Sequence, residues 1–447
     1  MDTSSKKRGT RFGENPSPRE GRGFSPAAPA PSTQIDKKIG KRFSARPKAP
    51  PPQQCAAAGR QHQRLTVGLM AGTSLDGVDA ALVQLTGPIE RPRVKLLRFI
   101  TVAYPAELHA RLLHISGGGA TKAAEISELN FHVGEAFARA VLRVCRRARV
   151  DPKRLAVIGS HGQTIFHQGS AVGKVRASTL QIGEPALIAS LAGAPVVADF
   201  RTADLAVGGE GAPLVPLVDY LLLGNDRLGT VALNIGGIAN VTIIPARARP
   251  ADVFGFDTGP GNMVMDALVR HFTGGAEGYD AGGGVAAQGQ VIDAVLWQAL
   301  RYPFFHRRPP KSAGREQFGR EFVTRYFLAK SDGRREDLLR TALELTAWSI
   351  ANALQRSVFP RFEPGRKLHR LVVSGGGAHN RLLITRLQEL LPALQLHVSD
   401  DFGLPVDAKE AIAFAILAER TLHGLPGNLP SVTGANRSAV LGKVVQP

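Results

Sequence analysis

From residue 65 onward, short apolar runs of strand length alternate with segments whose apolar residues recur every three or four positions. Residues 123–147 form the clearest helical segment, because their apolar positions share one face. Four apolar runs of strand type end in glycine or polar residues and read as buried strands; they are 67–70, 155–158, 195–198 and 371–374. Strands interspersed with helices predict an α/β fold.

The first polar interruption joins two apolar runs and predicts a tight strand-loop-strand hairpin. Its residues are Gly72, Thr73, Ser74, Leu75, Asp76, Gly77, Val78 and Asp79. The glycines allow close approach of a bulky anion, Thr73 and Ser74 offer hydroxyl groups to phosphate oxygens, and Asp76 is a candidate ligand for Mg²⁺. A lone loop of this kind is more often an ordinary hairpin with a glycine-rich turn.

The same strand, glycine turn and strand return at 231–244. A shift of 164 residues lays Gly72 on Gly236 and Asp76 on Asn240, with Gly237 completing the second turn. Two similar hairpins predict two similar lobes, although two short hairpins also match by chance.

A third glycine turn follows the run 371–374. Gly375, Gly376 and Gly377 end this strand, and a helix with leucines on one side opens at Asn380. Three glycines permit a flat adenosine to pack against backbone beside a helix N-terminus. We therefore interpret the three glycine elements as one nucleotide site. No GxxxxGK[ST] motif occurs in the sequence.

Two further predicted strands are followed by candidate functional residues. His161 follows the strand 155–158, and either substrate contact or a hydrogen-bonded structural role suits it. Asp199 closes the strand 195–198, where it is suited to be a general base on a hydroxyl or water, with a salt bridge to Arg201 as the equal alternative. The loop around Asp257 is a further candidate for positioning phosphates or Mg²⁺.

Charge is concentrated at the N-terminus. Residues 1–64 hold 14 Lys or Arg against 4 Asp or Glu, a net +10 of the total +19, together with nine prolines and no apolar periodicity. This predicts a disordered basic tail. The two cysteines, Cys55 and Cys145, favour a reducing compartment, and neither a secretory signal nor a membrane-spanning run is apparent, so we expect a cytoplasmic protein.

The set of motifs resembles the bacterial anhydro-N-acetylmuramic acid kinases over about residues 66–440. The matching segments are GTSLDGVD (72–79), GSHGQT (159–164), QIGEP (181–185), VADFR (197–201), GGEGAPLVP (208–216), LNIGGIANVT (233–242), FDTGPGN (256–262), YDAGG (279–283), VSGGGAHN (373–380) and DAKEA (407–411). The long basic tail lies outside the family pattern, and Glu210 stands where glutamine is expected.

The resemblance implies a two-lobed, duplicated actin-like sugar-kinase fold of the ribonuclease H type, with ATP and Mg²⁺ in the cleft between lobes. Its expected domains are the tail 1–64, lobe I at 65–228 with a C-terminal return at about 409–447, and lobe II at 229–408. The implied reaction phosphorylates the 6-oxygen of 1,6-anhydro-N-acetylmuramic acid while water opens the anhydro ring, for cell-wall recycling. Asp199 would be the catalytic base, and Glu410 would lie near the sugar, unless it is simply a first-turn helix glutamate.

Two alternatives stay open. Another sugar kinase of this fold would share the nucleotide elements but would need no ring-opening water. A sugar-sensing regulator that binds nucleic acid through the tail is disfavoured, because no helix-turn-helix pattern accompanies the charge. The expected partner is a small anhydro-amino sugar, without membrane or nucleic acid, and a homodimer is retained as an expectation.

Overall fold

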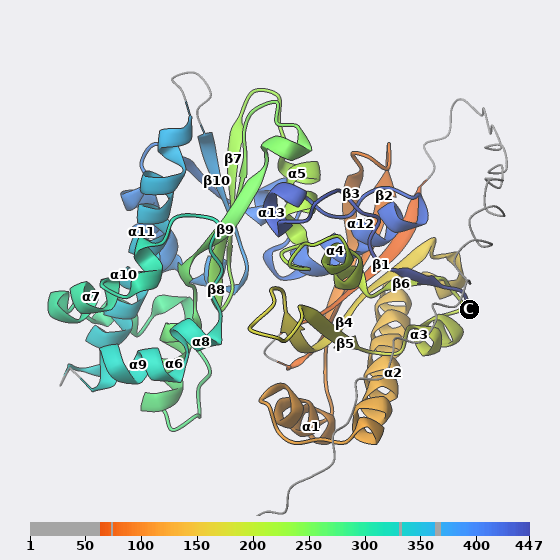
Figure 1. The fold of residues 1–447 in the computed structure, drawn as a ribbon, viewed down its shortest axis with the longest axis horizontal. Helices are drawn as coiled ribbons and strands as arrows, with labels where there is room; N and C mark the ends of the chain where they lie inside the picture. The colour runs from red at the N-terminus through yellow and green to blue at the C-terminus, as the bar shows by residue number, and fades with distance from the viewer. Residues whose placement is uncertain (1–62, 73–74, 330–332, 363–367) are drawn as a thin grey trace, which may run out of the picture. The chain divides into compact units, whose positions relative to one another are not determined.

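The structure, a computed structural model, describes residues 63–72, 75–329, 333–362 and 368–447. The predicted tail lies outside these ranges except for its last two residues, and Arg64 opens the first strand. Strands form one sheet of seven and one of five, with helices between them in the sequence (Figure 1). The predicted α/β class is therefore confirmed. Within the described ranges, no helix combines the length and apolar character needed to cross a membrane.

The first sheet has the order β12-β6-β4-β1-β2-β3, and β5 pairs with β4. Strand β2 runs antiparallel to both β1 and β3, whereas β4 is parallel to both β1 and β6. Its strands are β1 (Arg64–Ala71), β2 (Gly77–Thr86), β3 (Arg93–Ala103), β4 (Val157–Gln168), β5 (Ser178–Ile182), β6 (Val196–Ala198) and β12 (Lys443–Val445).

The second sheet has the order β11-β10-β7-β8-β9. Strands β7, β8 and β9 are antiparallel, and β10 is parallel to both β7 and β11. This is the order and direction of β6-β4-β1-β2-β3, so the hairpin repeat detected in the sequence belongs to a repeated sheet. The strands are β7 (Gly229–Ile235), β8 (Ile238–Ile244), β9 (Phe254–Pro260), β10 (Leu368–Ser374) and β11 (Gln395–Val398).

One predicted equivalence between the two hairpins is wrong. Met70 in β1 faces Asp79, and its counterpart Asn234 in β7 faces Asn240. Asn240 is therefore the counterpart of Asp79 rather than of Asp76. The uniform shift of 164 residues fails after the turn, because five positions separate the end of β1 from the start of β2, whereas only two separate β7 from β8.

Thirteen α-helices occur in the described part of the chain. They are α1 (Ala106–Ser116), α2 (Ala123–Ala148), α3 (Pro185–Ala192), α4 (Phe200–Ala206), α5 (Val215–Leu223), α6 (Met263–Phe272), α7 (Asp293–Leu300), α8 (Arg315–Phe318), α9 (Arg320–Val323), α10 (Arg335–Ser357), α11 (Arg381–Leu390), α12 (Lys409–Leu422) and α13 (Pro430–Thr433). In the second sheet, α10 packs against β9 and is flanked by α6, α7 and α11.

Helices α2 and α12 cover opposite faces of the first sheet. In β2, Val78, Ala80 and Leu82 belong to the apolar cluster that includes α2. The alternate residues Ala81, Val83 and Leu85 belong to the cluster that includes α12. This period of two is the pattern of a strand buried on both faces. Figure 1 shows α12, in blue, beside the orange strands β1 and β2.

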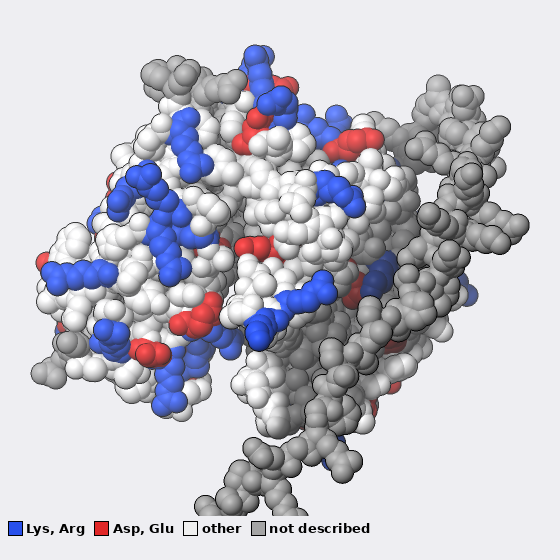
Figure 2. Space-filling model, in the orientation of Figure 1, with Lys and Arg blue, Asp and Glu red and all other residues white. Residues whose placement is uncertain are grey.

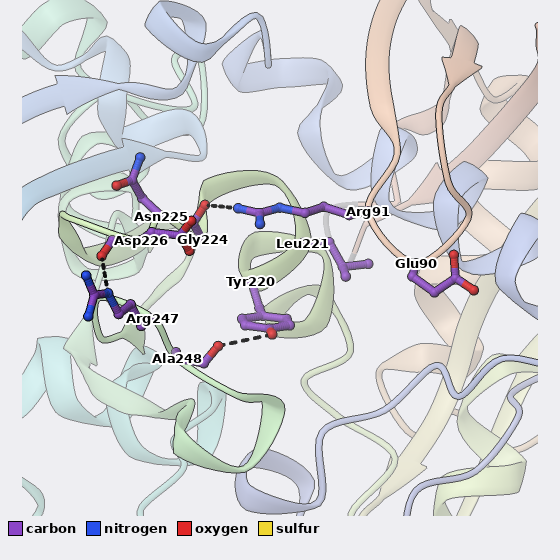
Figure 3. Close-up of a pocket in the computed structure, with 9 residues that line it drawn as sticks. All are labelled: Glu90, Arg91, Tyr220, Leu221, Gly224, Asn225, Asp226, Arg247 and Ala248. Carbon is purple, nitrogen blue, oxygen red and sulfur yellow. Dashed lines mark hydrogen bonds between the residues drawn. The ribbon is translucent and has the colours of Figure 1, made fainter. Parts of the chain in front are cut away.

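The α12 cluster also contains residues of the second sheet. Ala232 of β7 and Val372 of β10 join it, together with α5. A hydrogen bond also connects the two parts, because Arg91 in the β2–β3 turn donates to the carbonyl oxygen of Gly224 at 2.7 Å (Figure 3). The two sheets therefore share one apolar junction, with α12 in its middle.

Candidate functional site

A cavity of about 390 Å³ lies at the carboxyl end of β6, among α2, β4, β5 and the start of α3. Its volume is in the range of small-molecule sites. It is lined by both His161 and Asp199, two of the residues selected from the sequence. The polar residues that line it are Ser127, Asn130, Ser160, His161, Gln181, Glu184 and Asp199.

Asp199 follows β6 directly and precedes α4. Its backbone has φ 58°, in the left-handed region that is uncommon for a residue other than glycine. Its side chain is 34% exposed, and Oδ2 lies 2.6 Å from Nζ of Lys443. The ion pair weighed from the sequence, to Arg201, does not form. A non-glycine residue held in this conformation at a cavity is typical of functional sites.

His161 is buried, and both of its ring nitrogens have partners. Arg201 Nε donates to His161 Nε2 over 3.1 Å, which leaves His161 Nδ1 to donate to the carbonyl oxygen of Gly162 at 2.8 Å. Burial, together with the Arg201 charge, lowers the pKa of His161 well below its usual value. This neutral, fully hydrogen-bonded imidazole fits the structural alternative better than direct substrate contact.

GSHGQT was expected to follow the end of a short strand, and this is wrong. Strand β4 continues to Gln168, so the motif lies within it. Gly162 has φ 75°, and the pairing with β1 shifts register beside it. The irregularity redirects β4 from β1 and β6 toward β5, because an extra residue bends a strand.

Glu410 lies in the first turn of α12, which crosses β1 and β4 very closely. A Cβ on Gly68 would overlap the Ala411 carbonyl oxygen, and one on Gly159 would overlap that of Phe414. Burial raises the pKa of Glu410, the Asp79 charge adds to the rise, and Lys409 and Arg201 oppose it. The helix thus brings Glu410 into electrostatic range of both Asp79 and Arg201.

In the first hairpin, Thr73 and Ser74 lie outside the described residues, so their predicted phosphate contacts are not described. Asp76 is exposed, and Leu75 is buried with φ 64°. Asp79 accepts a hydrogen bond of 2.6 Å from Thr101 Oγ1. Burial raises the pKa of Asp79, with further increases from Asp407 and Asp76. Several carboxyl groups therefore converge near this hairpin.

The second hairpin and the third glycine turn are in contact. A Cβ on Gly375 would meet Asn234 Oδ1 and the Ile235 carbonyl, and φ of Gly375 is 78°. Asn262 N donates to the Gly236 carbonyl oxygen at 2.8 Å, which joins the FDTGPGN motif to the same place. Gly236, Gly237 and Gly375 to Gly377 therefore form one glycine-lined region, as a site built from backbone requires. Asn240 lies in β8, opposite Asn234 of β7, and its contact with nucleotide stays a prediction.

A short helical turn, η10 (Val406–Ala408), connects this region to the first hairpin. It contacts both β2 and the turn η8 (Gly376–His379). His379 Nε2 lies 2.9 Å from Asp407 Oδ1, and both side chains are exposed. The DAKEA and VSGGGAHN motifs are distant from GTSLDGVD in the sequence. Through η10, both lie beside the GTSLDGVD hairpin.

Asp257, the other candidate near phosphates, has protein partners for its carboxylate. Ala313 N donates to its Oδ2 at 2.8 Å. Burial raises the pKa of Asp257 to about 6, against the opposing effects of this hydrogen bond and of Lys311. Burial likewise lowers the pKa of Lys311 to about 8. Asp257 therefore stabilises the loop 311–313, through its hydrogen bond with Ala313 and the nearby charge of Lys311.

Charged side chains of both signs occur on the face drawn in Figure 2, with Lys and Arg spread over it and Asp and Glu among them. Within the described ranges, no group of three or more His, Cys, Asp or Glu side chains is arranged to hold a metal ion. A cation here would therefore need ligands from a bound molecule or water in addition to protein carboxylates.

The roles of two residues that line the cavity, Asn130 and Glu184, and of Lys443 beside Asp199 were missed from the sequence. Asn130 accepts from Gly183 N at 2.7 Å and donates to Glu184 Oε2 at 2.9 Å, so α2 and the start of α3 are joined at the cavity wall. Glu184 was included in the QIGEP segment, but no role at the cavity was assigned to it. Lys443 carried no local signal, because its partner Asp199 is 244 positions away.

The sequence is similar to a family of known proteins. A family model described as anhydro-N-acetylmuramic acid kinase matches residues 64–447. A protein of that name from Caldanaerobacter subterraneus subsp. tengcongensis is 41% identical over 390 residues, covering 86% of this chain and 97% of its own. A second, from Bacillus cereus strain Q1, is 41% identical over 382 residues and covers 85% and 98%.

Among solved structures, a ROK family glucokinase from Streptomyces griseus in complex with glucose and AMPPNP covers 80% of this chain and 99% of its own, with a TM-score of 0.36 and 14% identity. A likeness this weak carries no argument about function.

Proposed function

The chain belongs to the anhydro-N-acetylmuramic acid kinase family, and we propose that it uses ATP to phosphorylate the 6-oxygen of 1,6-anhydro-N-acetylmuramic acid while water opens the anhydro ring. The products would be N-acetylmuramic acid 6-phosphate and ADP, in peptidoglycan recycling. The observation that carries this proposal is the carboxylate of Asp199, held in a left-handed backbone conformation at the wall of a sugar-sized cavity.

Asp199 is the proposed general base. It accepts the proton of a water molecule whose oxygen attacks the anomeric carbon. As the bond between that carbon and the 6-oxygen breaks, negative charge develops on the 6-oxygen, which then attacks the γ-phosphorus of ATP and displaces ADP. Oδ1 of Asp199 has no hydrogen-bond partner among the described residues, so one carboxylate oxygen is available to the water.

Glu410 and His161 are proposed to act around the sugar in different ways. The raised pKa of the buried Glu410, within electrostatic range of Asp79 and Arg201, suits a group that hydrogen-bonds a sugar hydroxyl. His161 has both nitrogens occupied and is better suited to hold Arg201 in place than to bind sugar itself. The polar wall of Asn130 and Glu184 offers further hydrogen bonds.

The nucleotide is proposed to bind along the glycine elements. In the first hairpin these are Gly72 to Asp79, and in the second they are Gly236, Gly237 and Asn240. The adenosine would pack on Gly375 to Gly377. A Cβ at Gly375 would collide with the Ile235 carbonyl oxygen, and one at Gly377 would collide with the Ile235 side chain. Phosphoryl transfer depends mainly on alignment and charge neutralisation, which backbone amides and hydroxyls of these turns are suited to supply.

Mg²⁺ fits the donor set near the first hairpin. Asp76 is exposed, and the charges of Asp407 and Asp76 both raise the pKa of Asp79, so negative charge accumulates there. Mg²⁺ is commonly held by one or two carboxylates plus phosphate oxygens and water. We propose Asp76 as the metal-side carboxylate, where the ion would neutralise charge on the transferred phosphoryl group.

Product analysis in ¹⁸O-water tests this function against a sugar kinase that does not open the ring. Purified protein is incubated with ATP and the anhydro-sugar, and the phosphorylated product is analysed by mass spectrometry. We expect one ¹⁸O at the anomeric hydroxyl. A phosphorylated product without label would mean simple transfer, and no product at all would overturn both kinase assignments for this sugar.

The cellular compartment and the oligomeric state of the protein are further proposals. Because the proposed reaction consumes ATP and a small anhydro-amino sugar, we propose that it takes place in the cytoplasm. The homodimer is likewise proposed, and light scattering of the purified full chain measures it directly.

A further inference from the structure

The C-terminal strand β12 pairs with β6, the strand that delivers Asp199. The two run antiparallel, and Lys443 lies opposite Ala198, the residue immediately before Asp199. The end of the chain therefore closes this side of the sheet at the candidate base. None of the motifs that resemble the kinase family includes this segment.

The residues before Lys443 hold it there. Leu441 is fully buried, and its carbonyl oxygen accepts a hydrogen bond of 2.5 Å from Thr421 Oγ1 in α12. Gly442 follows with φ 84°, and a Cβ on it would press against Val197 and the Ala198 carbonyl oxygen. Only glycine allows so close an approach here, and the approach sets Lys443 beside Asp199.

The resulting contact is short but largely exposed. Lys443 Nζ lies 2.6 Å from Asp199 Oδ2, while the side chains are 69% and 34% exposed. Exposed ion pairs contribute little to stability, because water screens them and the lysine loses conformational freedom. Stability of the fold therefore gives no strong reason for this pair. Its geometric effect is larger, because it engages one oxygen of the carboxylate and leaves the other without a hydrogen-bond partner among the described residues.

We propose that Lys443 is a positioning residue for Asp199. Its ammonium group holds Oδ2, so that Oδ1 is turned toward the cavity and the attacking water. The inference rests on the proposed function, since it assigns Lys443 a part in the same proton transfer. Lys443 acts through Asp199 and does not itself contact the sugar.

The test compares three variants of the full chain. Lys443→Met removes the charge and keeps most of the side-chain length, Lys443→Arg keeps a cation, and Val444→Ala is the matched control on the same strand. Val444 is opposite Val197, and its side chain is 44% exposed. For each, kcat, KM for both substrates and the midpoint of thermal unfolding are measured.

We expect Lys443→Met to lower kcat about 10-fold, because small displacements of a catalytic group cost rate without affecting binding. KM for both substrates should stay within about twofold, Lys443→Arg should recover most of the rate, and Val444→Ala should match wild type. A kcat of Lys443→Met within twofold of wild type overturns the inference, as does an equal loss in Val444→Ala.

A double variant separates positioning from a general structural effect. If Lys443 acts through Asp199, adding Lys443→Met to Asp199→Asn should cause no further loss of kcat, because the two changes affect one step. A full additional 10-fold loss would contradict this. Failure of wild type to form labelled product overturns the proposed function and the inference together, whereas an active wild type with an unaffected Lys443→Met overturns the inference alone.

Discussion

At the residue scale, the partners of each charged side chain decide what it can do. His161 and Asp199 both line the cavity, yet His161 has two hydrogen bonds to its ring while Asp199 keeps one free oxygen. A buried neutral histidine orients its neighbours, and a half-exposed carboxylate can accept a proton. The cavity therefore contains one residue suited to acid-base chemistry and one suited to support it.

Asp199→Asn should abolish most turnover while leaving ligand binding intact. The amide has nearly the same shape but cannot accept the proton of water, and removing a general base lowers kcat by about 10²–10⁴-fold. Calorimetry with the anhydro-sugar should give a dissociation constant close to that of wild type. A parallel loss of sugar binding would instead assign Asp199 a structural role.

Asp257 should make stability depend on pH in an identifiable direction. Because its pKa is raised to about 6 from 3.8, the folded state holds the proton more tightly than the unfolded state. Its stabilising effect is complete below pH about 4 and is lost as pH rises through about 6, and it amounts to about 2–3 kcal/mol.

The check uses Asp257→Asn and urea unfolding at pH 4.5 and 7. The amide can still accept the hydrogen bond from Ala313 N. Relative to wild type, the variant should gain stability as pH rises, since only wild type loses its proton. Equal pH dependence of both proteins would show that the group titrates normally.

At the element scale, two glycines of the first sheet allow α12 to pack closely against it. Gly68 and Gly159 are register partners on β1 and β4, and both contact the backbone of α12 without a side chain between. The two strands thus present a flat patch on which the helix lies close. Glu410 directly precedes Ala411, whose carbonyl oxygen lies at this contact, so the close packing sets the position of Glu410.

Gly159→Ala should destabilise the protein by about 1–3 kcal/mol, because an added methyl group in a packed interior forces backbone to move. Gly278→Ala is the matched control, since nothing lies within 4 Å of a Cβ placed there, and surface changes of that kind stay within about 0.5 kcal/mol. Urea unfolding compares the two. Equal stability of both variants would mean that α12 is not closely packed at Gly159.

At the scale of the whole molecule, one buried ammonium group links the two sheets. Lys409 Nζ lies 2.7 Å from Asp219 Oδ1 in α5 and donates to Ser374 Oγ at 3.0 Å, at the end of β10. Ser374 precedes the glycine turn, and Lys409 precedes Glu410. The proposed adenosine and sugar regions are therefore joined through a single side chain in the junction between sheets.

Lys409→Met should cost about 3–5 kcal/mol, because it leaves the Asp219 carboxylate buried without its partner. Adding Asp219→Asn should restore part of the loss, since the remaining group is then neutral. Denaturant unfolding of both single variants and the double variant forms the required cycle. Strict additivity of the two changes would show that the pair does not interact.

A chain that begins at residue 63 should keep wild-type kcat and KM. Arg64 has to be retained, because it opens β1 and its Nε lies 3.3 Å from Glu419 Oε2. The family match likewise begins at residue 64. Steady-state kinetics of the two chains provide the comparison, and a more than threefold fall in kcat/KM would assign residues 1–62 a part in catalysis.

Much of the local structure was predictable from the sequence. The helix expected at 123–147 is α2 at Ala123–Ala148, and the apolar runs around the three glycine turns are strands. The spacing of apolar residues indicates which face of each element is buried, and glycines indicate where the backbone turns or approaches another segment closely. The whole set of motifs, taken together, was sufficient to identify the family.

The sequence by itself determined the elements, their apolar faces and the set of candidate side chains, because neighbouring residues specify backbone conformation and burial. Only the tertiary structure decided the partners: Lys443 rather than Arg201 for Asp199, two hydrogen bonds for His161, and Asn240 as the counterpart of Asp79. Those pairings depend on which strands meet in a sheet and on turn length. Ionic and hydrogen-bonded contacts act over a few ångströms in space, regardless of the number of residues between them in the chain.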